Sequence, residues 1–113
     1  MTHSLVSTLL AHYLVAQARY AEARRAMSRA ARTFAKLARH FGDDRAATLA
    51  GVHLADARSV AACQRRWRVR QALAAVLDHE PTVTRLVVWG AVLCAELPRA
   101  ANHNRQAVPP DAA

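Results

Sequence analysis

The sequence has little of what catalytic and metal sites are usually built from. It contains only three glycines and two cysteines among 113 residues, and it has no glycine-rich phosphate loop, His-Glu-x-x-His motif or Cys-x-x-Cys motif. The six histidines never fall at metal-ligand spacing, and no serine or threonine lies in a nucleophile-elbow context. The sequence therefore predicts a protein that is not an enzyme and that carries no cofactor and no metal ion.

We also expect no segment for secretion or for crossing a membrane. The start, Met1-Thr2-His3-Ser4, lacks the basic start and the cleavage pattern of a signal peptide. Cys63 and Cys94 lie in apolar runs and are interpreted as small core residues rather than as a disulfide framework. The uncharged span between Arg85 and Glu96 is ten residues, too short for a membrane-spanning helix. We expect a cytoplasmic protein with neither a membrane nor a small-molecule substrate as its partner.

Acidic residues are scarce, and the basic residues are concentrated in the middle of the chain. Eight acidic residues face sixteen basic ones, so the net charge is +8 and the sequence pI is about 11.2. Residues 19–70 alone hold thirteen of the cations and four of the acids, a net charge of +9. Fifteen of the sixteen cations are arginine, whose planar guanidinium pairs well with phosphate. This distribution favours nucleic acid as a partner.

One long stretch, residues 6–41, contains no glycine or proline, and its apolar residues recur at alternating spacings of three and four. This is the heptad pattern of a helix packed against other helices. The resulting seam consists of Val6, Leu9, Tyr13, Ala16, Tyr20, Ala23, Met27, Ala30, Phe34, Leu37 and Phe41. The pattern predicts a single long first helix.

The rest of the chain predicts a bundle around this helix. Gly42 is expected as a left-handed C-terminal cap, and a second helix over residues 44–79 should fold back antiparallel. A third, buried helix is expected over residues 82–97, with Gly90 and Cys94 allowing close packing. Trp67 is interpreted as a core residue, with stacking on a base left open. The fold class is all-α: a compact bundle of three to four helices in one domain, residues 1–98, with a flexible C-terminal tail, residues 99–113.

The basic side chains form rows at helical spacing. One row lies opposite the apolar seam of the first helix, a second lies on one side of the second helix, and two further arginines form a pair. We expect all ten to bind nucleic-acid backbone: Arg25, Arg29, Arg32, Lys36, Arg39, Arg58, Arg65, Arg68, Arg66 and Arg70. Four apolar residues beside the seam are expected to form a subunit interface: Leu5, Leu10, Leu14 and Val15.

A small, basic, all-helical chain with an arginine-lined outer face resembles the small subunit of CRISPR effector complexes. The resemblance is one of architecture, and it rests on the long first helix, the return helix and the basic stretch Arg65–Arg70. It implies a structural subunit of a ribonucleoprotein in antiviral defence, holding target or displaced nucleic acid without sequence specificity. The sequence does not distinguish RNA from DNA as the bound polymer, nor a single strand from a double strand. The alternative is a helical protein–protein adaptor or homodimer with no role in nucleic-acid binding.

Overall fold

The computed structural model describes the backbone of residues 2–98 and the side chains of residues 5–98, and it is all-helical over this range. Four helices follow one another: α1 (Thr2–Leu37), α2 (Asp43–Ala50), α3 (Val52–Leu77) and α4 (Thr82–Glu96). The predicted all-α bundle with a long first helix is therefore confirmed. The tail predicted for residues 99–113 lies outside the described residues.

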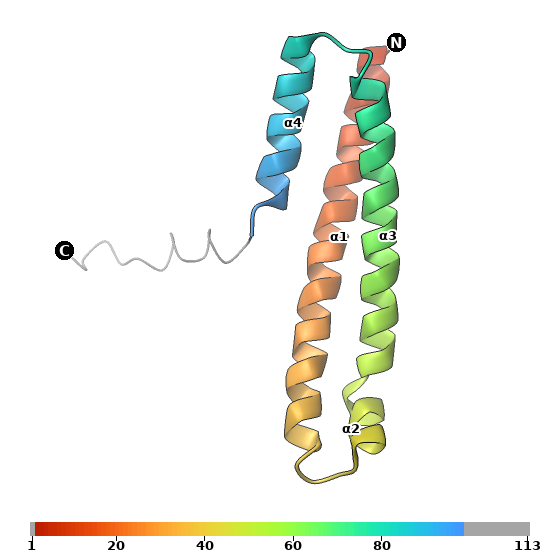
Figure 1. Ribbon diagram of the computed structural model, residues 1–113, viewed down its shortest axis with the longest axis vertical. Coiled ribbons are helices and arrows are strands. Elements are labelled where there is room, and N and C mark those ends of the chain that lie inside the picture. The colour runs from red at the N-terminus through yellow and green to blue at the C-terminus, as the bar shows by residue number, and fades with distance from the viewer. Residues whose placement is uncertain (1, 99–113) are drawn as a thin grey trace, which may run out of the picture.

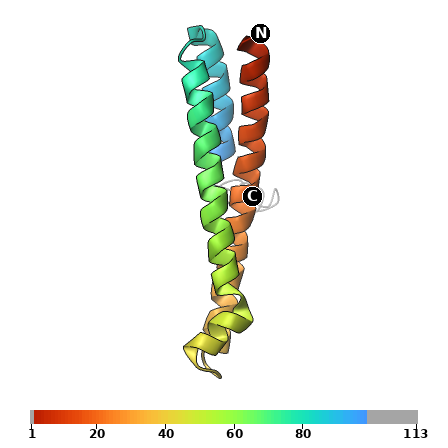
Figure 2. The ribbon, with the colours of Figure 1, turned by 90° about the vertical axis from the view of Figure 1, so that its right-hand side faces the viewer.

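The helices form an antiparallel pair with a third helix along one half of it. Helices α1 and α3 lie side by side over most of their length, joined at one end by the short α2 (Figure 1). Helix α4 runs back beside the other end, so it covers the N-terminal half of α1 and the C-terminal half of α3 (Figures 1 and 2). Among residues 2–98, no third helix lies beside the half of the pair that adjoins α2 (Figure 1).

The first helix ends earlier than the heptad pattern predicted. Residues 38–40 form a turn in which the backbone N–H groups of His40 and Phe41 both donate to the Leu37 carbonyl, at 3.0 and 2.9 Å. Phe41 is thus outside the helix and exposed. Gly42 is extended, with φ −65° and ψ 157°, and precedes α2. The prediction of a left-handed cap at Gly42 is wrong, because the turn has already ended the helix.

The predicted second helix is broken at Gly51 into α2 and α3. Gly51 has φ 70° and ψ 29°, the left-handed conformation that side chains with a Cβ disfavour. Its N–H donates to the Thr48 carbonyl at 3.2 Å and so closes α2. Helix α2 consequently lies oblique to α3 (Figure 2). The sequence pattern did not predict this break, because a single glycine such as Gly51 can also occur inside a continuous helix.

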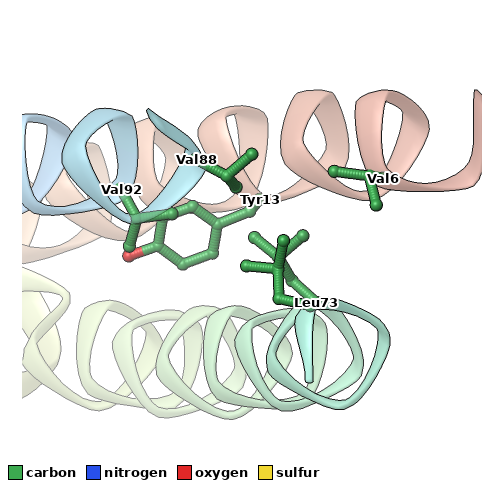
Figure 3. Packing of buried hydrophobic residues seen from close by; sticks show 6 residues of the cluster. Val6, Tyr13, Leu73, Val88 and Val92 are labelled. Atoms are coloured by element: carbon green, nitrogen blue, oxygen red, sulfur yellow. The ribbon is translucent and has the colours of Figure 1, made fainter. Parts of the chain in front are cut away.

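The core lies where three helices meet. Its fully or nearly buried side chains come from α1, α3 and α4 and are drawn in Figure 3: Val6, Tyr13, Leu73, Leu77, Val88 and Val92. Farther along α1, Ala16 and Ala30 are also buried, on the part of α1 that packs against α3. The predicted seam of α1 is therefore the packed side of the helix, with Phe41 as the exception.

Three predictions about burial are wrong. Trp67 was expected in the core, but its side chain is 60% exposed. The helix over residues 82–97 was expected to be buried, but only Val88 and Val92 of α4 are buried. Cys94 was expected to be a small core residue, but it is exposed. These errors have one cause: three helices cover each other on one side only, so apolar residues on their outer sides have no partner within the described chain.

Candidate nucleic-acid interface

Two of the predicted binding residues have partners inside the bundle, and Arg70 is the first. Its Nε donates to Oε2 of Glu96 at 2.8 Å, and its guanidinium lies 5.1 Å from the centre of the Trp89 ring. The hydroxyl of Tyr13 donates to the same Glu96 oxygen. Burial and the Glu96 carboxylate raise the pKa of Tyr13 to about 12, and the hydrogen bond from Arg70 lowers the pKa of Glu96. Arg70 thus ties α3 to α4.

Arg66 is the second, and it joins α3 to α1. Its Nη1 donates to Oε1 of Gln17 at 3.2 Å, and its guanidinium lies 4.3 Å from the centre of the Tyr20 ring. A cation over an aromatic face at this distance is a stabilising contact. The expected role of Arg66 and Arg70 in nucleic-acid binding stays a prediction, and a polymer would have to compete with these internal contacts.

The predicted row on α1 is partly neutralised by an acid of its own helix. Glu22 accepts hydrogen bonds from Arg25 at 2.6 Å and from Arg29 at 3.3 Å, and these bonds lower the pKa of its carboxyl group. Lys36 and Arg32 are exposed and make no ion pair with any described residue. Arg39 lies in the turn after α1, so the helical register of the row ends at Lys36.

Cations from both long helices meet in the groove between α1 and α3. One shallow hollow of about 280 Å³ is lined by Arg19 of α1 and Arg65 of α3, with Val15 and Val69 among its apolar neighbours. A second hollow, of about 250 Å³, is lined by Arg29 of α1 and Arg58 of α3. We call these two hollows, with their four arginines, the α1–α3 groove.

The groove runs along the side of α1 that α4 leaves free. Leu14, Gln17 and Ala21 line a separate hollow together with the end of α4, so α4 lies on their side of α1. Val15, Arg19 and the other groove residues of α1 follow at helical spacing on the opposite side. Arg19 and Arg29 are ten residues apart, which corresponds to roughly 15 Å along the helix. The two hollows are therefore consecutive parts of one groove.

The groove is basic, and none of the described residues that line its two hollows is acidic. His12 joins Arg19 and Arg65 in the first hollow. Arg58 and Arg65 are exposed and form no ion pair within the described residues, whereas Arg29 shares Glu22 with Arg25. A site of this kind attracts an extended anion, because its cations are held on two rigid helices and only Arg29 among them has an ion pair within the described residues.

The sequence predicted three of these four arginines but not their grouping. Arg29 belonged to one row, Arg58 and Arg65 to another, and Arg19 was not among the predicted site residues. Grouping them requires the register between α1 and α3, which neither helix carries alone. Arg68 is exposed but lies outside the groove, in a hollow with Trp67, Cys63 and Gln64.

The four residues predicted as a subunit interface do not form one patch. Leu14 lies on the α4 side of α1 and Val15 lies in the α1–α3 groove, while Leu10 packs against the core. Leu5 and Leu14 are exposed. Whether any of them contacts another subunit stays a prediction.

Comparison of the chain with models of known protein families, with curated proteins and with solved structures finds no match. Within residues 2–98, no helix is both long enough and apolar enough to cross a membrane. In the same range, no three His, Cys, Asp or Glu side chains are grouped so that they could hold a metal ion.

Proposed function

We propose that this protein binds the sugar–phosphate backbone of nucleic acid in the α1–α3 groove, without reading base sequence and without catalysis. The observation that carries the proposal is the convergence of Arg19, Arg29, Arg58 and Arg65 from two helices on the side that α4 leaves free. Phosphate contacts fix position but carry no sequence information, so a site made of them is sequence-independent.

The geometry suits a polymer better than a small anion. Each hollow offers one arginine from α1 and one from α3, and the two pairs are roughly 10–15 Å apart along the groove. A polyanion that follows the groove meets both pairs, whereas a single phosphate fills one hollow only. The four cations repel one another in the free protein. A bound polyanion screens this repulsion, so its relief strengthens binding.

In the cell, the protein would serve as a structural subunit of a larger cytoplasmic ribonucleoprotein. The specific form of this proposal is the small subunit of a CRISPR effector complex, and its support is the resemblance drawn from the sequence, that of a small, basic, all-helical chain with a long first helix. Purification of the tagged protein from its host tests this role. Copurification with nucleic acid and with other subunits of a ribonucleoprotein supports it, and recovery of the protein alone opposes it.

Binding itself is tested with labelled oligonucleotides of equal length and unrelated sequence, as single and double strands of RNA and of DNA. Fluorescence anisotropy at low salt should give similar affinities for unrelated sequences of one polymer type. The difference between polymer types then identifies the preferred ligand. Absence of binding to all of them at low salt would refute the proposal. A strong preference for one sequence would refute the backbone mechanism.

The second candidate function, a protein–protein adaptor or homodimer, is favoured by a different observation. Helix α4 exposes a continuous apolar side that could pack against another protein chain.

A further inference from the structure

Helix α4 carries an apolar face that nothing in the described chain covers. Five large side chains on this face, Val83, Leu86, Val87, Leu93 and Leu97, are between 54% and 72% exposed. Gly90 and Cys94 lie between them and are exposed too. Contiguous apolar surface of this kind marks an interaction site, since scattered apolar residues are normal on a protein surface but a whole helix face is not.

The face has the spacing of a helix-packing seam. Val83, Leu86, Gly90, Leu93 and Leu97 follow one another at intervals of three, four, three and four residues. This alternation keeps one line of side chains against a neighbouring helix. The core uses the opposite side of α4, through Val88 and Val92. Helix α4 therefore has two packing seams, and only one of them has a partner within the described residues.

We propose that the outer face of α4 packs against α4 of a second copy of this chain, antiparallel, with the two-fold axis near Gly90. A two-fold interface requires one patch that is complementary to itself. The exposed apolar residues lie symmetrically about Gly90: Leu86 and Cys94 are four residues away on either side, Val87 and Leu93 three, and Val83 and Leu97 seven. Reversing the helix therefore superimposes the apolar positions on themselves.

Gly90 is suited to the centre of such a crossing. No described residue has an atom within 4 Å of the position that a Cβ would occupy there, so packing within residues 5–98 does not require the glycine. Glycine in a helix interior costs stability relative to alanine. At the crossing point of two helices, however, the missing side chain lets the backbones approach closely. The close packing expected at Gly90 and Cys94 is thus assigned to a second copy and not to the core.

The lack of charge on this face is compatible with a second copy as the occupant. Each chain has a net charge of +8, which opposes contact between two copies through most of their surface. The outer face of α4 has no charged residue, and the two charged residues of α4, Arg85 and Glu96, are half-buried on its other side. Because the α1–α3 groove lies on the far side of α1, a dimer through α4 keeps the two basic grooves apart. A membrane surface fits less well, because interfacial helices carry Lys or Arg along their polar flanks.

The size of the face sets the expected affinity. A helix of 15 residues is roughly 22 Å long, so the contact lies at the low end of specific interfaces. Leu14 extends the patch from α1, since it lines the same hollow as Leu97. We therefore expect a reversible dimer that is present at micromolar concentration and dissociates on dilution.

Cysteine cross-linking tests the arrangement directly. In the antiparallel dimer, residue 86 of one copy faces Cys94 of the other, so Leu86→Cys should form an intermolecular disulfide under mild oxidation. The matched control is Val83→Cys, an exposed position on the same face that lies opposite residue 97 instead. Both variants are made with Cys63→Ala, which removes the other native thiol. We expect a cross-linked dimer for Leu86→Cys and several-fold less for Val83→Cys.

Other outcomes would overturn the proposal. Cross-linking of Cys94 to itself in Cys63→Ala protein would indicate a parallel pair, and equal cross-linking of both variants would indicate random collision. Sedimentation of the unmodified protein gives an independent measurement. It should show a dimer that Leu86→Glu converts to a helical monomer. A wild-type monomer at the highest concentration reached would mean that the face serves a different protein. Dimerisation should be unchanged by Arg19→Gln and Arg65→Gln, so it is independent of the proposed nucleic-acid binding.

Discussion

Arg70 of α3 and Glu96 of α4 form a salt bridge at 2.8 Å that joins the two helices. The hydroxyl of Tyr13 on α1 donates to the same carboxylate, so all three long helices contact a single side chain. Both partners of the salt bridge are partly shielded from solvent, with side-chain exposures of 32% and 21%. An arginine that looked available for a ligand is thus part of what holds α4 in place.

This arrangement predicts a loss of stability in acid. Arg70 lowers the pKa of Glu96 below its ordinary value of 4.5, so the folded protein binds fewer protons at this carboxyl than the unfolded chain does. The contribution of Glu96 is therefore complete above pH 4.5 and is lost as the pH falls through the lowered pKa. Urea unfolding at neutral pH and at several acidic pH values should show this decline in wild type and a weaker one in Glu96→Gln. Glu80→Gln, which removes a carboxylate without a described ion pair, should behave like wild type. Equal slopes in all three proteins would contradict the role of Glu96.

Arg66 and Arg68 should differ in their effect on stability although they are two residues apart. Arg66→Gln removes a hydrogen bond to Gln17 and a contact with the Tyr20 ring, and we expect it to cost about 1–2 kcal/mol of unfolding free energy. Arg68→Gln changes an exposed side chain, and we expect a change within about 0.5 kcal/mol. Chemical denaturation of the free protein measures both. Similar losses in the two variants would show that the contacts of Arg66 do not stabilise the bundle.

Replacing Gly51 or Gly90 with alanine should change the stability of the monomer in opposite directions. Gly51→Ala places a side chain at φ 70° and should destabilise the protein by about 1 kcal/mol. Gly90→Ala adds a methyl group to an exposed helix position with free space, so the monomer should gain about 0.5–1 kcal/mol. The same methyl group lies at the centre of the proposed dimer and should raise its dissociation constant. Thermal melts of dilute protein and sedimentation of concentrated protein separate the two effects. A stabilised monomer whose dimer is equally strong would contradict close approach at Gly90.

The sequence was sufficient to predict those parts of the fold that depend on a local repeating pattern. The seam from Val6 to Leu37 and the end of α4 before Pro98 follow from spacing and from proline chemistry, and the structure has both. It was not sufficient where geometry depends on contacts between helices. The partners of Arg66 and Arg70 come from α1 and α4, at sequence separations of 49 and 26 residues, which no local spacing reveals.

Burial was harder to predict than helicity for a physical reason. An apolar residue such as Trp67 or Leu86 carries the same signal whether it packs in the core or against another molecule. Only the arrangement of the helices in the bundle decided that both are exposed. The register between α1 and α3 grouped Arg19 with Arg65 in one hollow, which the separate rows on each helix did not indicate.

The salt dependence of nucleic-acid binding is the sharpest test of whether the α1–α3 groove holds the phosphate backbone. If all four groove arginines contact phosphates, the logarithm of the affinity should fall with the logarithm of salt concentration at a slope of about 2.8 for a single strand or about 3.6 for a duplex. Replacing Arg19 and Arg65 together with Gln should lower that slope by about 1.4–1.8. The charge-matched control, Arg32→Gln with Lys36→Gln on the outer side of α1, should leave it nearly unchanged. An unchanged slope in the groove variant, with a lowered slope in the control, would contradict the account and place the polymer on the outer row of α1.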